Sequence, residues 1–267
     1  MTPDDHARAA ADLLEAERTG EQIGLLSLRH PEIGMDDAYA IQNAIYAQKL
    51  AEGRKVIGWK IGLTSRAMQS ALRIDIPDSG ILFDDMAFQN GGTVPGGRFI
   101  QPRIEAEIAF IMKAAIGGPN VTRDDVLAAT GHVAPSIEIL DTRIQRADPE
   151  TGKVRTVHDT ISDNASNAGV VLGNKRHPAD VFDLRWVGAL VFRNGDIEET
   201  GLGAGVLNDP AESVAWLARR MAGYGQNIEP GNIILSGSFI RPIECPAGTE
   251  IHADFGQFGT VDIKFAE

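Results

Sequence analysis

Glu105 and Glu107 lie two residues apart in an otherwise apolar segment, residues 104–112. Alternate residues of a β-strand point to the same face, so both carboxylates project from one side of a segment that has the composition of a buried strand. Two buried like charges repel each other and lose their hydration, which is costly unless a partner compensates. The segment therefore predicts a strand whose one face carries an unusual acidic pair.

A hard divalent cation would compensate this pair, because Mg²⁺ and Mn²⁺ prefer carboxylate and water oxygens. Glu138 is a third candidate ligand, since it is the single acid in the apolar segment 133–140. The alternative is that these acids face solvent, as acids that alternate along a strand usually do. Against that alternative, the parity of the pair continues into Ala109 and Ile111, so this face does not stay polar.

Composition limits the class of protein. The chain has 267 residues, 43% of them hydrophobic and 23% charged, which is typical of a soluble protein with a full core. A net charge of −12 argues against non-specific nucleic-acid binding. The chain has one cysteine, a polar amino-terminal segment unlike a signal peptide and no apolar run of about 20 residues. We expect a cytoplasmic protein with neither a membrane nor a nucleic-acid partner.

Local patterns predict helices and strands along the chain. Apolar spacing and end signals predict helices, and Asn194-Gly195 is a strong signal for a tight hairpin turn after a strand. A Thr122–Asp125 capping box and an Asp209-Pro210 start are further helix signals. The expected helices span 4–18, 36–52, 122–131 and a segment after 209; the expected strands span 56–63, 184–192, 232–235 and 259–265.

These strands follow one another without regularly alternating helices. That order favours a mixed, largely antiparallel α+β fold over a doubly wound parallel sheet. We expect residues 1–54 to form an N-terminal helical cap or subdomain and residues 55–267 to form one catalytic domain.

Several other polar residues are candidates for chemistry. Lys60 lies among apolar residues and glycines, so it is either buried beside an anion or a surface lysine with an apolar stem. Asp78 lies in a Pro-Asp-Ser-Gly segment and could serve only the turn. Ser238 and Arg241 share a short segment, where the arginine could bind a carboxylate or lie at the surface.

The segment 158–167 is dense in short polar side chains and precedes an apolar strand. It is either an ordinary loop or a loop that positions a polar ligand. His158 and Asp159 do not indicate a catalytic dyad, because adjacent residues in a strand point apart and no serine lies in a nucleophile elbow.

Taken in order, these segments resemble the fumarylacetoacetase-like superfamily, and within it the hydratase/decarboxylase branch of aromatic meta-cleavage pathways. The resemblance covers essentially the whole chain. It implies a β-sheet roll of the fumarylacetoacetase C-terminal-domain type and a ring-like homo-oligomer. The segments that carry it are Gly-Trp-Lys-Ile-Gly-Leu-Thr (58–64), Pro-Asp-Ser-Gly (77–80), Arg-Ile-Glu-Ala-Glu (103–107), Ile-Glu-Ile (137–139), Asp-Thr-Ile-Ser-Asp-Asn-Ala (159–165) and Gly-Ser-Phe-Ile-Arg-Pro (237–242).

The resemblance also implies roles for individual residues. Glu105, Glu107 and Glu138 would hold a divalent metal, usually Mg²⁺ with Mn²⁺ as an alternative, and Lys60 and Asp78 would lie in the catalytic pocket. We further expect Arg241 to bind the substrate's distal carboxylate, and Ser238 to be a second substrate-binding residue. One position departs from the family pattern, because Ser79 follows the aspartate where an aromatic residue is expected.

The implied activity is a hydro-lyase reaction on a 2-oxo or 2-hydroxy dienoic acid. The segment 237–242 favours a seven-carbon dioate, 2-hydroxyhepta-2,4-dienedioate, which would give 4-hydroxy-2-oxoheptanedioate. The alternatives are hydration of 2-hydroxypenta-2,4-dienoate, which lacks the distal carboxylate, and decarboxylation of 4-oxalocrotonate on the same metal site. In a different class, the chain could serve as a structural partner of a related enzyme.

Overall fold

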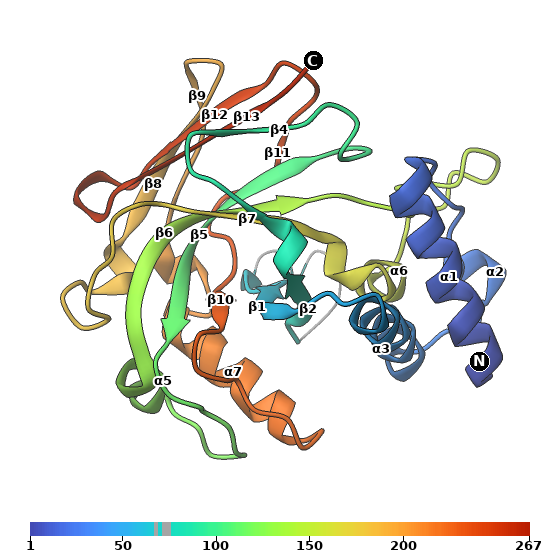
Figure 1. Cartoon of the computed structure of the whole chain (residues 1–267), viewed down its shortest axis with the longest axis horizontal. Coiled ribbons are helices and arrows are strands. Elements are labelled where there is room, and N and C mark those ends of the chain that lie inside the picture. Colours follow the sequence, from blue (N-terminus) through green and yellow to red (C-terminus); the bar gives the residue numbers. More distant parts are fainter. Residues whose placement is uncertain (67–68, 71–75) are drawn as a thin grey trace.

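The computed structural model describes residues 1–66, 69–70 and 76–267. Within these residues the chain folds into two β-sheets and several helices. The helices are α1 (Pro3–Thr19), α2 (Leu26–Arg29), α3 (Met35–Ala51), α5 (Arg123–Ala129), α6 (Val157–Ser162) and α7 (Pro210–Ala222). In Figure 1, α1, α2, α3 and α6 lie at the right, and α5 and α7 lie at the bottom. The strands are β1 (Val56–Gly62), β2 (Asp78–Phe83), β3 (Ala87–Phe88), β4 (Gly92–Val94), β5 (Arg103–Met112), β6 (Thr130–Leu140), β7 (Asn167–Leu172), β8 (Gly188–Arg193), β9 (Asp196–Leu202), β10 (Ile233–Leu235), β11 (Ile243–Glu244), β12 (Glu250–Asp254) and β13 (Thr260–Phe265).

The larger sheet has the strand order β2-β1-β10-β5-β6-β7-β3, and β11 adds to one end of β5. The smaller sheet has the order β4-β13-β12-β8-β9. Most neighbouring strands are antiparallel, but β1 with β10, β3 with β7 and β4 with β13 run parallel. The mixed, largely antiparallel fold predicted from the order of the elements is confirmed.

The N-terminal helices pack together on one side of the molecule, beside α6 (Figure 1). Capping begins α1, because Thr2 accepts a hydrogen bond from the Asp5 amide and Asp5 accepts one from the Thr2 amide in return. The helix ends at Gly20, which has a left-handed φ of 76°. These helices share a small core of their own that also includes Ile144. The boundary predicted at residue 54 stays a prediction.

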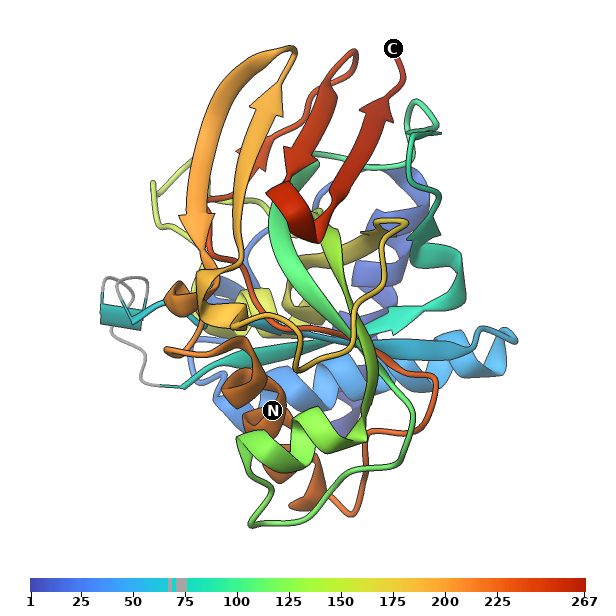
Figure 2. The ribbon, with the colours of Figure 1, turned by 90° about the vertical axis from the view of Figure 1, so that its left-hand side faces the viewer.

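The two sheets enclose the main hydrophobic core, with α5 and α7 at the opposite end of the molecule from the hairpins of the smaller sheet (Figure 2). The predicted hairpin turn is confirmed, since Asn194 and Gly195 both have positive φ between β8 and β9. The predicted start of that strand at residue 184 is wrong. Residues Leu184–Trp186 form a 3₁₀ turn, and β8 begins at Gly188.

Sequence reasoning missed two short helices, α2 and α6. The polar segment 158–167 begins in α6 and continues as a 3₁₀ turn, Asn164–Ser166, before β7. A capping box of Thr156 and Asp159 begins α6, as Thr122 and Asp125 begin α5.

Candidate metal and active site

The acidic residues of β5 and β6 meet on one face of the larger sheet. In the antiparallel register Glu105 lies opposite Glu138, and Glu107 lies opposite Ser136. Directly opposed residues of neighbouring strands share a face, so all three carboxylates project to the same side. One ligand oxygen from each of Glu105, Glu107 and Glu138 lies within 4.8 Å of the other two. We call these three residues the acid cluster.

The rest of this face is apolar, as the parity of the segment predicted. Further along β5, Ala109 and Ile111 belong to a hydrophobic cluster that also includes Leu235 and Val170. The opposite face of β5 packs into the main core through residues such as Phe110. A strand with a core on both faces gives its acids little access to water, which excludes the solvent-facing alternative for Glu107 and for Glu138 of the neighbouring strand.

The acid cluster is buried, and its charges are incompletely compensated. Glu107 and Glu138 have exposed fractions of 0%, and Glu105 is partly exposed. Glu107 Oε2 accepts a hydrogen bond of 2.7 Å from the Gly237 amide. Glu107 Oε1 and both carboxylate oxygens of Glu138 have no hydrogen-bond partner within the described part of the chain. Buried carboxylate oxygens without donors fit a divalent cation, which takes oxygen ligands.

The electrostatics agree with this geometry. Burial, followed by repulsion from Glu138, raises the pKa of Glu105 to about 8. The same two causes hold the pKa of Glu107 well above its usual value. Burial also raises the pKa of Glu138, although the charge of Lys60 opposes that rise. Groups whose pKa values are shifted by burial and by like charges cluster at functional sites.

Lys60 and Asp78 lie beside the acid cluster. Lys60 on β1 is 4% exposed, and its Nζ lies 3.4 Å from Glu138 Oε1. Burial alone would lower the pKa of Lys60. The negative charges of Glu138 and Asp78 outweigh that effect and raise the pKa above its usual value, so the ammonium keeps its charge. The surface alternative for Lys60 is therefore wrong.

Asp78 opens β2 and is 2% exposed, so it does more than complete a turn. Burial raises its pKa, and the charge of Lys60 offsets part of that rise. Gly62 faces Asp78 across the strand pair, and a Cβ at Gly62 would overlap Asp78 Oδ1. The aspartate therefore needs a glycine opposite it.

Sequence reasoning missed the contribution of the segment after β10. Gly237 has a φ of 111°, and this left-handed backbone aims its amide at Glu107. A Cβ there would overlap the side chain of the buried Thr64. Ser236, just before it, is fully buried and has a hydroxyl with no partner in the residues described. The sequence of this segment indicates polar side chains, but it does not show that a backbone amide within it reaches Glu107.

In the described part of the chain, the polar contacts of the two predicted substrate-binding residues do not involve the acid cluster. Arg241 is 83% exposed and forms an ion pair with Glu199. The Ser238 hydroxyl donates to the Ile240 carbonyl at 2.9 Å and accepts from the Ile240 amide at 3.2 Å. Neither contact supports a role at the substrate, so substrate binding by these two residues stays a prediction.

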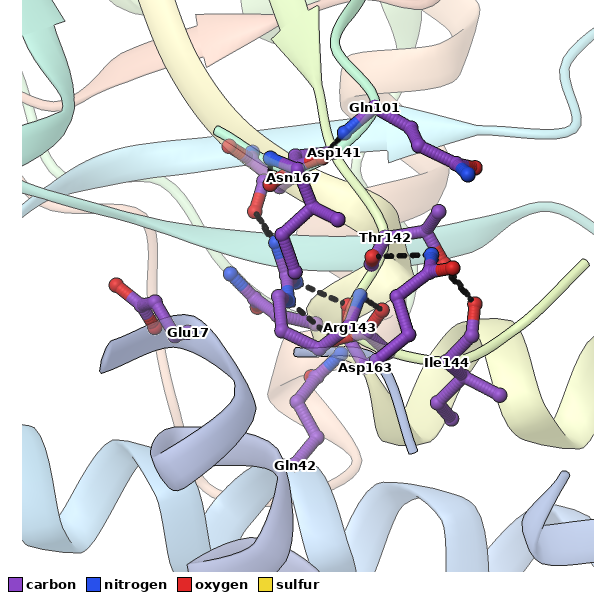
Figure 3. Close-up of polar contacts among 12 residues, drawn as sticks. Glu17, Gln42, Gln101, Asp141, Thr142, Arg143, Ile144, Asp163 and Asn167 are labelled. Atoms are coloured by element: carbon purple, nitrogen blue, oxygen red, sulfur yellow. Dashed lines mark hydrogen bonds and ion pairs between the residues drawn. The ribbon is translucent and has the colours of Figure 1, made fainter. Parts of the chain in front are cut away.

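A second group of buried charges lies between the N-terminal helices and the larger sheet (Figure 3). The Arg143 backbone amide donates to Asp163 Oδ2 at 2.9 Å, its Nε donates to Asp163 Oδ1, and its Nη2 donates to the Asp163 carbonyl at 2.8 Å. Nearby, Lys49 donates to Glu17 at 2.9 Å. We call Glu17, Lys49, Arg143 and Asp163 the Arg143 cluster. The cavity among them has room for about one water molecule, about 20 Å³.

Comparison with known proteins identifies the family. Over 260 residues, 97% of this chain and 97% of the relative, the sequence is 50% identical to 2-oxo-hept-4-ene-1,7-dioate hydratase of Escherichia coli. The chain belongs to the family of dienoate hydratases and 4-oxalocrotonate decarboxylases, the branch that its sequence resembles. As a member of this branch it is an enzyme, and its sequence identity places it with the hydro-lyases. Models of known protein families give no match to the chain.

Solved structures agree with this assignment. The fold matches 4-oxalocrotonate decarboxylase from Pseudomonas putida G7, complexed with magnesium and adipate, with a TM-score of 0.93 and 33% identity, over 99% of this chain and 98% of that chain. It also matches fumarylpyruvate hydrolase from Pseudomonas aeruginosa, complexed with Mn²⁺ and pyruvate, with a TM-score of 0.57 and 13% identity, over 78% and 88% of the two chains. This second match shows the fold alone.

Proposed function

We propose that this chain adds water to 2-hydroxyhepta-2,4-dienedioate, or to its keto form 2-oxo-hept-4-ene-1,7-dioate, and releases 4-hydroxy-2-oxoheptanedioate. We infer the substrate from the name of the 50% identical relative, 2-oxo-hept-4-ene-1,7-dioate hydratase. The observation that carries the chemistry is the set of buried carboxylate oxygens on Glu107 and Glu138 that lack donors in the described residues. A buried anionic site of this kind needs a cation, and 2-oxo acids present oxygens suited to the same cation.

Glu105, Glu107 and Glu138 would hold the cation, for which we propose Mg²⁺ with Mn²⁺ as a substitute. Both ions accompany structural neighbours of this chain. When bound, the cation would supply Lewis-acid stabilisation of the negative charge that develops on the 2-oxo group. The Gly237 amide, through its hydrogen bond to Glu107 Oε2, would keep that carboxylate oriented.

Asp78 would transfer protons, and Lys60 would stabilise negative charge on the substrate. Because burial raises its pKa, Asp78 can hold a proton and deliver it to C5 of the dienol, which leaves an α,β-unsaturated ketone. Once ionised, the same carboxylate can take a proton from the water that adds to C4, the electrophilic β-carbon. The proton that leaves the C2 hydroxyl in the first step balances the proton that C3 gains in the second. Lys60 stays protonated at 3.4 Å from Glu138, so its charge is available to a substrate carboxylate or enolate and keeps Asp78 from becoming too basic.

A turnover assay on the dienedioate tests this proposal. We expect Mg²⁺-loaded protein to consume the dienol absorbance and to form the 4-hydroxy product, and protein treated with a chelator to lose that activity until Mg²⁺ is restored. Mass spectrometry of the product identifies the reaction. A folded, Mg²⁺-loaded protein that turns over none of the dienoic acids would contradict the proposed function.

A second candidate is decarboxylation, because the fold neighbour with a TM-score of 0.93 is a 4-oxalocrotonate decarboxylase. The two reactions would use the same acid cluster and differ in the bond that breaks. Release of CO₂ from 4-oxalocrotonate, faster than hydration of the dienedioate, would favour the decarboxylase. Faster hydration of 2-hydroxypenta-2,4-dienoate than of the dienedioate would instead point to a pocket without a site for the distal carboxylate.

We also propose a ring-like homo-oligomer in the cytoplasm. Large apolar side chains are exposed along β9, the edge strand of the smaller sheet, at Ile197 and Leu202. An exposed apolar edge favours association with another copy. Light scattering that gives a monomer mass at micromolar concentration would contradict the oligomer.

The single cysteine, Cys245, is buried, and burial raises the pKa of its thiol to about 12, so the thiol is unreactive, which fits a reducing compartment. None of the helices that the structure describes is long and apolar enough to cross a membrane.

A further inference from the structure

Asp78 lies on a strand that has a neighbour on one side only. β2 ends the larger sheet, so β1 pairs with one of its edges and no described strand pairs with the other. An unpaired edge leaves backbone amides and carbonyls without partners, and it allows the strand to shift. A shift of β2 would move Asp78 relative to Lys60 and the acid cluster. Some other contact must therefore hold this edge.

Two buried side-chain amides take the place of the missing strand. The Ile81 amide donates to Asn164 Oδ1 at 2.8 Å, and Asn164 Nδ2 donates to the Ile81 carbonyl at 2.9 Å. One side chain thus reproduces the two-way hydrogen bonding of a paired strand residue. On the same strand, Gln42 Nε2 donates to the Ser79 carbonyl at 2.9 Å and also to the Ile161 carbonyl at 3.1 Å. Gln42 lies below the Arg143 cluster in Figure 3.

The backbone that presents Asn164 is strained. Asn164, Ala165 and Ser166 have φ values of 50°, 52° and 58°, a left-handed conformation that residues other than glycine rarely adopt, least of all three in succession. Residues held in this region persist only where their surroundings determine them, and they concentrate at functional sites. Here the strained turn is buried within the protein.

Both ends of the turn are fixed. Asp163 is held by Arg143, and the Asp141 amide donates to the Ser166 carbonyl at 2.9 Å. On its other side the turn touches β2 directly, because a Cβ at Gly80 would overlap the Asn164 carbonyl oxygen. The polar segment 158–167, for which the sequence allows an ordinary loop or a loop that positions a polar ligand, therefore connects the Arg143 cluster to the strand that carries Asp78.

We propose that Asn164 is a positioning residue for Asp78: the left-handed turn at residues 164–166 presents its amide to the free edge of β2 and so fixes the carboxylate against Lys60. Gln42 supports the same edge at Ser79. This inference rests on the proposed function, in which Asp78 transfers the proton. Asn164 itself acts through β2 and does not contact the reacting atoms.

Asn164→Ala tests this role, with Asn90→Ala as the matched control. Asn90 Oδ1 accepts a hydrogen bond of 2.7 Å from the Asp262 amide, a similar contact in the smaller sheet. We expect Asn164→Ala to lower kcat by roughly 100-fold, because a misplacement of about 1 Å can cost that much. The KM and the Mg²⁺ concentration for half-maximal activity should change less than about twofold. Asn90→Ala should leave all three values unchanged.

A combined variant separates positioning from a general loss of structure. If Asn164 acts through Asp78, Asn164→Ala should add less than about a twofold loss in an Asp78→Asn background. An equal loss in both backgrounds, or an unchanged kcat with only a lower melting temperature, would overturn the inference. Should Asn164→Ala fail to fold, Gln42→Met keeps the volume of that side chain and removes the Ser79 contact, and it should lower kcat in the same selective way. An unchanged kcat in folded Gln42→Met would then overturn the inference.

Amide hydrogen exchange tests the contact independently of turnover. The Ile81 amide should exchange slowly in the wild type and quickly in Asn164→Ala, whereas Trp59 on β1 should stay protected. If the wild type turned over no dienoic acid while Ile81 lost its protection in the variant, the proposed function would fail and the strand contact would stand. Unchanged exchange at Ile81 would overturn the inference whatever the activity.

Discussion

The acid cluster and the Arg143 cluster are both buried groups of charges, but their hydrogen bonding differs. In the Arg143 cluster both carboxylate oxygens of Asp163 accept hydrogen bonds from Arg143, whose guanidinium also reaches the Asp163 carbonyl. In the acid cluster Glu107 has one donor, and Glu138 has no hydrogen-bond donor in the described chain. The carboxylate of Asp163 has all its partners within the protein, whereas the carboxylates of the acid cluster need a bound cation to supply theirs.

This difference separates structural charge from functional charge. A buried ion pair whose hydrogen bonds are all made costs desolvation free energy when the chain folds. In the folded protein it then specifies how two segments pack together. Among the described residues, the three carboxylates of the acid cluster have only the charge of Lys60 within ion-pair distance, so their burial remains costly until a further cation arrives. We therefore expect substitutions in the Arg143 cluster to affect stability first, and substitutions in the acid cluster to affect activity first.

The largest effect is expected for Glu107→Gln. The substitution removes one ligand charge and keeps the size of the side chain, so kcat/KM should fall by roughly 1,000-fold or more, which is several kcal/mol. Isothermal titration with Mg²⁺ should show weaker binding in parallel. In the presence of a chelator the variant should be at least as stable as the wild type, because a buried like charge has been removed. A clear loss of metal-free stability would contradict the contrast between the two clusters.

The next effect concerns stability. Arg143→Met leaves Asp163 buried without its cation, so the free energy of unfolding should fall by about 3–5 kcal/mol. Urea denaturation at pH 7 measures the change. Arg185→Met is the control, because Arg185 pairs with Asp183 at the surface and its loss should have no measurable effect. If Arg143→Met were as stable as that control, the Arg143 cluster would have no structural role.

The part of the site that lies on β5 and β6 could be read from the sequence because its causes are local. A period of two on an apolar strand predicted that Glu105 and Glu107 share a face, and the structure confirms it. Glu138 was a candidate as the single acid of a second apolar segment, and the pairing of β5 with β6 brings it to the same pair. Their role as metal ligands stays a prediction. The hairpin at Asn194 and the capping of α5 were predictable for the same reason, since both depend on a few neighbouring residues.

The remaining parts of the site depend on contacts between distant segments. The burial of Lys60 follows from the position of β1 between β2 and β10, and the sequence near Lys60 does not encode that position. The hydrogen bond from Gly237 to Glu107 joins residues 130 positions apart and requires a positive φ. The helix α6 was missed for a different reason. Its Thr156–Asp159 capping box was present in the sequence, but the dense polar composition resembled a loop.

A third effect is expected in the pH dependence of the metal-free protein. The pKa of Glu105 rises from its ordinary value of 4.5 to about 8 on folding, so the folded state binds more protons than the unfolded state between these values. Stability of the chelator-treated protein should therefore fall as the pH rises from about 5 to about 8. Saturating Mg²⁺ should remove this decline, because bound metal stabilises the ionised carboxylates. Thermal melting at several pH values measures both curves, and identical curves with and without Mg²⁺ would mean that the acid cluster does not bind the ion.

The smallest effect is expected for Arg241→Leu, which tests the predicted anchor for the distal carboxylate. An anchor would raise KM for the dienedioate and leave KM for 2-hydroxypenta-2,4-dienoate unchanged, because only the first substrate carries the second carboxylate. The Arg241 side chain is 83% exposed and paired with Glu199, so it is hydrated and has an anionic partner already. We therefore expect both KM values to change less than about threefold, in line with the weak contribution of exposed charges. A tenfold or larger rise confined to the dienedioate would show that Arg241 leaves Glu199 for the substrate, and that a charge at the surface of the free protein belongs to the site.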